Sequence, residues 1–502
     1  MRSQPCYSIL DFGAIGDGST LSTAAIQSAL DTCRRAGGGT VLIPCGKFVT
    51  GALFLHDDIT LYMDAGSVLL GSENPDDYPI VDSRWEGRGR QTYAPLITGS
   101  GLNRIAITGR GVIDGRGASW WIKHRDKTLR YPRPRLISFV NCHNVLVEGV
   151  TLTNSPSWTI NPILCENVTV DKVTILNPPD SPNTDGINPD SCRNVHISNC
   201  HVDVGDDCIA IKSGIEVADR STLSPCENIA ITNCTMVHGH GGVVIGSEMS
   251  GNVRHVVVSN CVFIGTDRGI RLKSRRGRGG IVEDVRVTNV SMEDVLCPFT
   301  MNLYYHIGVK GNKEVSDKRP HPVDKGTPHF RGIHFSHITA HNAQYAAAFL
   351  YGLPEMPVEN VSFDNVSVSL ASNAHPGEPD MADDVEPMAR AGFFARNARG
   401  LRLCNVEVIG HSGPALRLLD VQDVEISASG TRTPAANSPV IELINARGVF
   451  VHGSDAPPGT DTFLFVEGES TQAVALSGNN LVRAKRSVAL GKTVPPDALA
   501  VV

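Results

Sequence analysis

A short phrase that recurs along the chain constrains the fold more than any other feature of this sequence. Each copy begins with a polar or small residue, continues with an alternating apolar run such as Val-x-Val or Ile-x-Ile, and ends in a polar turn. Copies start at Asn144, Asn167, Asn194, Asn228, His255, Asp284, Gly332, Asn360, Gly400, Asp423 and Gly448. The steps between them are 23, 27, 34, 27, 29, 48, 28, 40, 23 and 25 residues. No step is shorter than 23 residues, whereas the length added to the longer steps varies freely. This pattern indicates one structural coil per repeat, with insertions at chosen corners.

Short strands that are each followed by a turn, at a period in the twenties, predict an all-β parallel β-helix. The chain has 502 residues, a length that would ordinarily suggest several domains, but a solenoid can grow without enlarging its core. Abundant glycine (49) and proline (30) with few aromatic residues also favour a turn-rich β protein. We expect a single domain, with residues 1–50 forming an N-terminal cap and first coil and residues 51–502 the β-helix.

Helical signals are rare, and the strongest covers residues 23–35, TAAIQSALDTCRR, which has apolar residues at helical spacing and ends before three glycines. A short helix there would cap the first coil and protect its open strand edges. Three segments read as long loops, at about 116–134, 306–329 and 370–392. Loops of this length on a rigid scaffold are usually functional walls or lids. In the first of them, Trp120 and Trp121 could be sugar platforms or packing residues, and packing is favoured for at least one.

The chain's charge and its ends restrict the classes of partner. A formal net charge of −7 argues against nucleic acid as the main partner, although a local basic cleft for an acidic substrate remains compatible with it. The sequence contains neither a secretory h-region nor an apolar run of membrane-spanning length. We therefore expect a cytoplasmic protein, a monomer or small homo-oligomer, that does not bind a membrane. The thirteen cysteines are scattered, so we expect reduced, mostly buried thiols rather than a zinc site.

When the repeated strands are aligned, they bring charged residues together. Setting Ile187, Ile209, Val243, Ile270 and Met301 in register makes an inward apolar stack. Side chains alternate faces along a strand, and neighbouring strands lie about 4.8 Å apart. This register predicts one outer face that carries the acids Asp185, Asp206 and Asp207, with His240, Arg271, Lys273 and Tyr304 beside them. Tyr305 competes with Tyr304 but would face inward.

Three carboxylates this close repel one another, and glycoside hydrolysis exploits such crowding. One carboxyl group whose pKa its neighbours raise can protonate the leaving oxygen, while another carboxylate activates water. Arg271 and Lys273 suit a substrate that bears a carboxylate on every sugar. Each motif alone has an ordinary alternative, since Asp185-Gly186 or Asp206-Asp207 could be plain turns. The run Arg275, Arg276 and Arg278 could be either a solvated loop or an attractor of substrate.

The strings Asn183-Thr-Asp185, Gly205-Asp206-Asp207, Gly239-His240-Gly241 and Arg271-Leu-Lys273 resemble, in order, the four signature motifs of the polygalacturonases, glycoside hydrolase family 28. The layout resembles that of bacterial exo-acting members, and the resemblance covers roughly residues 8–430. It implies a right-handed parallel β-helix of the pectin-lyase-like type. It also implies hydrolysis of α-1,4-galacturonosyl bonds with inversion, on an acidic oligo- or polysaccharide, with no metal and no organic cofactor.

The resemblance further implies a role for each motif residue. Asp206 is expected to be the general acid, and Asp185 with Asp207 to hold and activate the water. His240 would support protonation of the acid. The residues expected to bind substrate are Asn183, Arg271, Lys273 and Tyr304.

Two other functions remain open at this point. A polysaccharide lyase on the same fold would hold calcium on carboxylates and abstract a proton with a basic residue. A non-catalytic glycan-binding β-helix, such as an adhesin or tailspike, would bind sugars without turnover. Within the hydrolase hypothesis, the missing export signal and the long loops favour exo action on short oligomers.

Overall fold

The computed structural model describes residues 5–215 and 220–501, and these form two compact units. The first unit comprises Met1–Val244 and Gly251–Val256, and the second comprises Ile245–Ser250 and Val257–Val502. The strands β24 (Val243–Gly246) and β25 (Val253–Ile264) run from one unit into the other.

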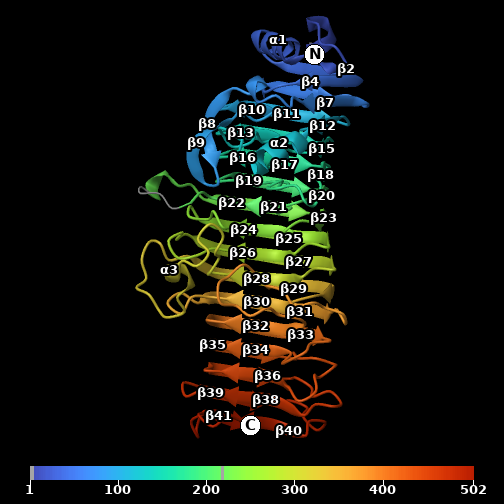
Figure 1. The fold of residues 1–502 in the computed structure, drawn as a ribbon. Coiled ribbons are helices and arrows are strands. Elements are labelled where there is room, and N and C mark those ends of the chain that lie inside the picture. The colour runs from blue at the N-terminus through green and yellow to red at the C-terminus, as the bar shows by residue number, and fades with distance from the viewer. Residues whose placement is uncertain (1–4, 216–219, 502) are drawn as a thin grey trace. The chain divides into compact units, whose positions relative to one another are not determined.

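In the first unit, parallel strands stack in three columns, coil upon coil (Figure 1). The first column contains β1 (Cys6–Ser8), β3 (Gly39–Ile43), β6 (Ile59–Met63), β11 (Asn103–Gly109), β14 (His143–Glu148), β17 (Glu166–Asp171), β19 (Arg193–Ser198) and β22 (Cys226–Thr232). The second contains β2 (Asp17–Leu21), β4 (Gly46–Thr50), β7 (Ser67–Gly71), β12 (Val112–Asp114), β15 (Thr151–Thr153), β18 (Thr174–Leu176), β20 (His201–Val204) and β23 (Thr235–His238). The third contains β5 (Leu53–Phe54), β10 (Ile97–Ser100), β13 (Ile137–Val140), β16 (Ile160–Ile163) and β21 (Ile209–Ile211).

In the second unit, parallel strands form two columns, and the first strands of one column are long because they run through a corner without a break. This column contains β27 (Ile281–Glu293), β29 (His329–Ala343), β31 (Val358–Leu370), β33 (Ala398–Ile409), β35 (Gln422–Ser427), β37 (Arg447–His452), β39 (Gln472–Ser477) and β41 (Leu499–Val501). The other contains β26 (Arg268–Lys273), β28 (Cys297–Asn302), β30 (Ala346–Tyr351), β32 (Ala391–Arg396), β34 (Leu416–Leu419), β36 (Pro439–Ile444), β38 (Thr462–Glu467) and β40 (Arg486–Leu490). The predicted right-handed parallel β-helix is confirmed.

The N-terminal helix α1 (Thr23–Arg35) has the predicted bounds. It buries Ile26, Ala29, Leu30 and Cys33 against the first strands and lies at the end of the first unit (Figure 1). Short 3₁₀ turns occupy Ile9–Phe12, Pro75–Asp77 and Arg220–Thr222. The amphipathic helix therefore covers the open edge of the first coil, as its apolar spacing predicted.

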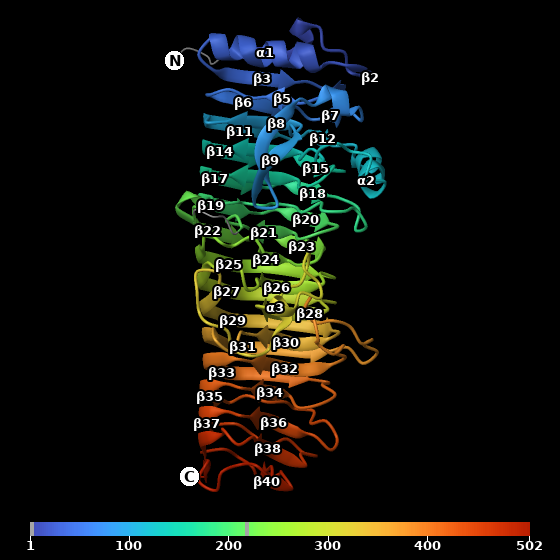
Figure 2. The same ribbon diagram turned by 60° about the vertical axis from the view of Figure 1, so that its left-hand side comes forward.

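The three predicted long loops lie between strands, as expected. The first carries the helix α2 (Gly117–Arg125), in which Trp120 and Trp121 are both buried, so the packing interpretation holds for both. The second, between β28 and β29, carries the one-turn helix α3 (Lys313–Ser316). The third separates β31 from β32. The repeat pattern did not predict the antiparallel hairpin of β8 (Ile80–Trp85) and β9 (Arg88–Tyr93), which stands outside the stacked strands (Figure 2).

The recurring phrase has a backbone explanation. The first residue of every copy has a positive φ, from 51° at Asp284 to 68° at Gly400, so it forms the left-handed turn that starts the next strand. Asparagine tolerates this conformation better than most residues, and its side chain can bond to its neighbours. The apolar residues that follow are buried and stack between coils, as at Val145, Val168, Val195 and Ile229. Ten of the thirteen cysteines are also buried, which confirms that expectation.

Asparagine side chains at these turns form a ladder. Asn167 donates through Nδ2 to Oδ1 of Asn144 at 3.2 Å, and Asn194 donates in the same way to Asn167 at 3.0 Å. We expect Asn167→Ala to lower the free energy of unfolding by about 1–2 kcal/mol, because alanine both breaks the ladder and strains a φ of 58°. Asn167→Gly, which removes only the ladder bonds, should cost less. Denaturant unfolding of both variants measures the difference, and equal losses would contradict a contribution from backbone strain.

Candidate active site

The three predicted acids meet at one point of the first unit. Asp185, Asp206 and Asp207 each offer a carboxylate oxygen, and these oxygens all lie within 4.8 Å of one another. Asp185 lies just before the bridge of Ile187 to Ile209, and the Gly186 amide donates to the Asp207 carbonyl at 3.0 Å. The predicted register of these two coils is therefore confirmed. The acids are less exposed than expected, since Asp185 and Asp207 are buried and only Asp206 is half-buried.

Glycines beside the acids allow two coils to approach closely. A Cβ at Gly186 would lie 2.4 Å from the Cys208 carbonyl, and one at Gly205 would lie 2.5 Å from the Ser181 carbonyl. Gly239 has a φ of 71°, and a Cβ there would lie 2.5 Å from the Asp206 carbonyl. Any side chain at these positions would push the acid-bearing turns apart. The glycines of the signature strings thus set the spacing of the carboxyl groups.

Burial raises the pKa of Asp185 well above its usual range, and the neighbouring Asp206 and Asp207 raise it further. Two neighbouring groups lower the pKa of Asp185. Lys212 Nζ lies 3.9 Å from Asp185 Oδ2, and Asn188 Nδ2 donates to the same oxygen at 2.9 Å. Because repulsion within the cluster is not fully relieved, the cluster favours retaining a proton.

Asp206 is the acid that is most accessible, with 19% of its side chain exposed. Its Oδ1 accepts from the Asp207 amide at 2.8 Å and lies 3.3 Å from His240 Nδ1. His240 is itself 44% exposed, and its amide donates to the Asp206 carbonyl at 3.1 Å. A substrate can therefore reach Asp206 and His240 from solvent, while Asp185 and Asp207 lie behind them.

A stack of aromatic and cationic side chains supports the cluster from one side. Lys212 Nζ lies 4.9 Å from the centre of the Trp158 ring, and Trp158 stacks on Trp85 with 5.4 Å between ring centroids and 7° between planes. Arg135 lies within 5.3 Å of both rings. Trp85 belongs to the hairpin, and its neighbour Arg84 bonds to Asp190 at 2.8 Å. The hairpin therefore packs on Trp158, whose ring lies beside the lysine that faces Asp185, a link that the sequence did not indicate.

Arg133, at the end of the first long loop, is a second residue that the sequence analysis missed. Its guanidinium is buried and donates to Asn183 Oδ1 at 2.6 Å and to the Pro182 carbonyl at 2.7 Å. Burial lowers the pKa of Arg133 to about 10, although Asp185 and Asp206 oppose this shift. Asn183, a predicted substrate-binding residue, has a φ of 53° and is held in place by this contact. Only the Arg-rich string at 130–135 hints at this role in the sequence.

The predicted basic pair lies in the second unit. Arg271 and Lys273 are both on β26, and their charged groups lie 5.7 Å and 5.4 Å from the centre of the Tyr305 ring. Arg271 NH2 also bonds to Asp380 Oδ1 at 2.7 Å, a residue 109 positions away in the third long loop. Burial opposes ionisation of Asp380, but Arg271 and Arg268 hold the pKa of its carboxyl below the usual value. This buried partner of Arg271 was not predicted.

The predicted register is wrong at the next strand. Ile270 pairs with Phe299, and Leu272 pairs with Met301, so β28 is shifted by two residues from the expected alignment. A shift of two keeps every side chain on its face but places Asn302, not Tyr304, beside Lys273. The apolar pattern cannot distinguish these two registers, because Phe299 and Met301 are both suitable core residues.

The expected exposure of Tyr304 is also wrong. The strand ends at Asn302, the chain turns, and the Tyr304 ring is only 1% exposed. It packs 4.6 Å from the Tyr351 ring and lies under Lys318. Tyr305, which was expected to face inward, is instead the aromatic residue beside the basic pair.

In the basic run that follows the pair, Arg275 is half-buried, whereas the other two arginines are buried and not solvated. Arg276 is buried and forms an ion pair with Glu355, with 2.6 Å from Nε to Oε1. It also donates to the carbonyls of Asp317 and Arg319, which fixes the second long loop. Arg278 is buried as well. Arg276 therefore anchors the loop, a role that neither sequence interpretation included.

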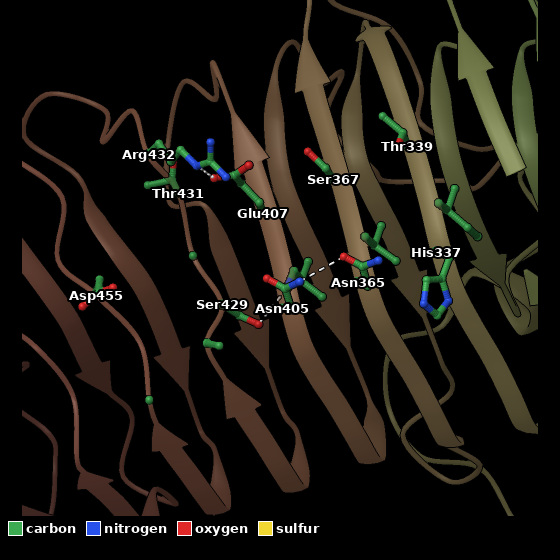
Figure 3. A pocket seen from close by; sticks show the side chains of 16 residues that line it. His337, Thr339, Asn365, Ser367, Asn405, Glu407, Ser429, Thr431, Arg432 and Asp455 are labelled. Carbon is green, nitrogen blue, oxygen red and sulfur yellow. Dashed lines mark hydrogen bonds and ion pairs between the residues drawn. The ribbon is translucent and has the colours of Figure 1, made fainter. Parts of the chain in front are cut away.

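The acid cluster is also the place where a divalent cation could bind, because three carboxylates can each supply an oxygen. A polar pocket of 780 Å³ in the second unit is a poorer candidate for chemistry. In it, Asn405 bonds to Asn365 at 3.0 Å and Glu407 to Arg432 at 2.5 Å, so these groups join successive coils (Figure 3). No helix among the described residues is both long and apolar enough to cross a membrane.

A parallel β-helix that gathers carboxyl groups on neighbouring coils places the chain in the class of carbohydrate-cleaving enzymes built on this fold. Comparison with known proteins identifies the family within it. The sequence model of the glycosyl hydrolases family 28 matches residues 54–377. The chain belongs to this family.

Named relatives and solved structures agree with this assignment. A protein from Vitis vinifera described as a probable polygalacturonase is 36% identical over 377 residues, which cover 73% of this chain and 75% of the relative. An exo-poly-alpha-D-galacturonosidase from Dickeya chrysanthemi is 29% identical, over 57% of this chain and 55% of the relative. The crystal structure of a hyperthermoactive exopolygalacturonase from Thermotoga maritima is similar with a TM-score of 0.68 and 29% identity, covering 82% of this chain and 94% of that one.

Proposed function

We propose that this protein hydrolyses the α-1,4-galacturonosyl bonds of polygalacturonate or its oligomers, with inversion. The observation that carries the proposal is the meeting of three carboxyl groups, one of them with a raised pKa, within 4.8 Å. Asp206, half-buried and beside His240, is placed to protonate the leaving oxygen. Asp185 and Asp207, behind it, are suited to hold a water, and whichever of the two is ionised can activate it. Several relatives are described as polygalacturonases.

Recognition of the substrate's carboxylates is assigned to Arg271 and Lys273, with Asn183 as a further contact. Both cations lie on one strand against one aromatic ring, which fixes their spacing. They are buried rather than on an open outer face as expected, and Asp380 pairs with Arg271, so Lys273 is the cation of the pair whose charge this acid does not offset. Guanidinium and ammonium groups suit an anionic sugar. Tyr305 replaces Tyr304 as the aromatic residue proposed to serve this part of the site.

Incubation of the purified protein with polygalacturonate tests the function. We expect reducing ends to accumulate without an unsaturated product that absorbs in the ultraviolet. Because the acid cluster could hold a cation, the same assay with a chelator tests the lyase alternative. An unsaturated product whose formation the chelator prevents would show that the protein cleaves the chain by elimination, as a lyase does, and not by hydrolysis. Binding without any turnover would instead support a non-catalytic glycan-binding protein.

We further propose exo action. Two inserted segments, the hairpin and the loop that carries Arg133, are both fixed to the coil that bears Asp185. They support a site closed on one side, where a chain end would fit. Relatives described as exo-acting support the same assignment, although relatives described as endo-acting are also similar. A cytoplasmic location and a monomeric or small oligomeric state stay predictions.

Products from a defined galacturonate oligomer distinguish the two modes. Exo action releases a monomer or dimer from the first turnovers onward, whereas intermediate sizes at early times would show endo action. Product sizes separated by chromatography over a time course give the answer.

A further inference from the structure

A basic pocket in the second unit is separate in its residues from the acid cluster. It has a volume of 400 Å³ and lies among the turns that follow β32, β34 and β36. The cations that line it are Lys318, Arg396, Arg399 and Arg447, and the one acid is Asp420. Asn397, Gln422, Asn445 and Ser470 add neutral polar groups, and Pro354 and Pro357 add an apolar side. This excess of positive charge is unusual in a chain whose net charge is −7.

Lys318 is held at the pocket by aromatic rings. Its Nζ lies 3.8 Å from the centre of the Tyr304 ring and 4.8 Å from that of Tyr351, and it donates to the Asp383 carbonyl at 3.2 Å. Burial lowers the pKa of Lys318 to about 8, and Arg396 and Arg276 add to this against the opposing pull of Asp384 and Asp383. An incoming anion would relieve this crowding of cations.

The arginines are only partly neutralised by the protein. Arg396 Nε bonds to Asp420 Oδ2 at 3.0 Å, and Asn445 donates to the other oxygen of the same acid at 3.2 Å. Arg399 pairs with Glu359, and Arg447 Nε donates to the Ser470 carbonyl at 3.1 Å. Four cations thus line the pocket with one acid, Asp420, while Glu359, Asp383 and Asp384 act on Arg399 and Lys318 from outside the lining.

A second pocket adjoins the first, because Arg399 lines both. It has a volume of 600 Å³ and adds Arg402 and His334 with Asp423. Arg402 Nε lies 3.9 Å from Glu425 Oε2, and both side chains are largely exposed. Together the two pockets are lined by five lysine and arginine side chains and offer more space than one small ion fills.

We propose that these pockets form an auxiliary site that binds the carboxylate groups of a uronate chain. Galacturonan presents one carboxylate and several hydroxyl groups on every sugar, which arginine forks and amide side chains can bind. A sugar ring can lie against the proline side. This inference deepens the proposed function and rests on it for the identity of the chain, but its test does not depend on turnover.

The test uses the double variant Arg399→Gln/Arg447→Gln in the background of the inactive Asp206→Asn protein. Arg447 is exposed, Arg399 is half exposed, and neither belongs to the proposed catalytic site, so the fold should persist. A matched control, Arg417→Gln/Arg486→Gln, removes the same charge from paired, exposed arginines outside both pockets. Affinity electrophoresis in polygalacturonate gels measures binding. We expect the pocket variant to bind the polymer about tenfold more weakly and the control to bind as its parent does.

Two results would overturn the inference. One is equal polymer affinity for the pocket variant and the control. The other is competition by inorganic phosphate that matches competition by oligogalacturonate at equal charge, since this would show a general anion site. Weaker polymer binding by the pocket variant, combined with no hydrolysis by the protein that retains Asp206, would sustain the auxiliary site and refute the proposed function, so the two failures are distinguishable.

Discussion

Replacing Asp206 with Asn should reduce turnover of polygalacturonate by a factor of about 10²–10⁴, the range that a positioned general acid contributes. The asparagine keeps the size of the side chain and can still accept from the Asp207 amide, but it has no proton to give to the leaving oxygen. Substrate affinity should change little, because the lost step belongs to the transition state. Initial rates of reducing-end release at saturating substrate measure this directly.

The chain provides a matched control at Asp203, which pairs with His238 at 2.8 Å much as Asp206 pairs with His240. Asp203 lies outside the acid cluster, so Asp203→Asn should retain wild-type turnover. Full activity in Asp206→Asn, or an equal loss in both variants, would refute the assignment of Asp206 as the acid. Circular dichroism of each variant shows whether the fold persists.

The fold could be predicted from the sequence because each coil repeats the same local physics. A left-handed turn residue, an alternating apolar run and a second turn recur with few exceptions, so periodicity alone indicates the β-helix. The helix at 23–35 followed from its own apolar spacing and its glycine stop. The shift of β28 shows where periodicity fails, because two registers that differ by two residues bury equally apolar sets.

The acids could be predicted for the same reason, since Asp185 and Asp207 lie at equivalent places on neighbouring coils and Asp206 directly precedes Asp207. Their partners could not. Arg133 and the hairpin residue Trp85 reach the site from insertions that follow no repeat. Asp380 meets Arg271 across 109 residues of sequence. No local pattern encodes such contacts, because they depend on how a long loop folds back over the coils.

The buried position of Tyr304 illustrates the same limit. The alternation of side chains predicted its direction only for as long as the strand continues, and β28 ends two residues earlier. Beyond that point the chain turns, and packing with Tyr351 and Lys318 decides where the ring lies. The identity of residues in the site was therefore more predictable than their orientation at strand ends.

Replacing Asp185 with Asn should abolish most activity and at the same time stabilise the protein. The pKa of Asp185 is raised by burial and then by Asp206 and Asp207, so the folded state favours the neutral carboxyl. The stability from this preference is fully present below the usual aspartate pKa and is lost as pH rises through the raised value. Asparagine stays neutral and can still accept from Asn188, so it escapes the loss.

The expected signature of Asp185→Asn is a gap in thermal midpoint that depends on pH. The variant and the wild type should unfold at similar temperatures near pH 3, where Asp185 is protonated in both states of the wild type. The variant should become the more stable protein as the pH rises toward neutrality, while its rate on polygalacturonate falls by about 10²-fold or more. Differential scanning calorimetry across this pH range measures the gap, with Asp203→Asn as the control that should show no such rise. A wild type more stable than Asp185→Asn at pH 7 would mean that Lys212 outweighs the repulsion among the three carboxylates, and the cluster would then hold no stored electrostatic strain for catalysis to use.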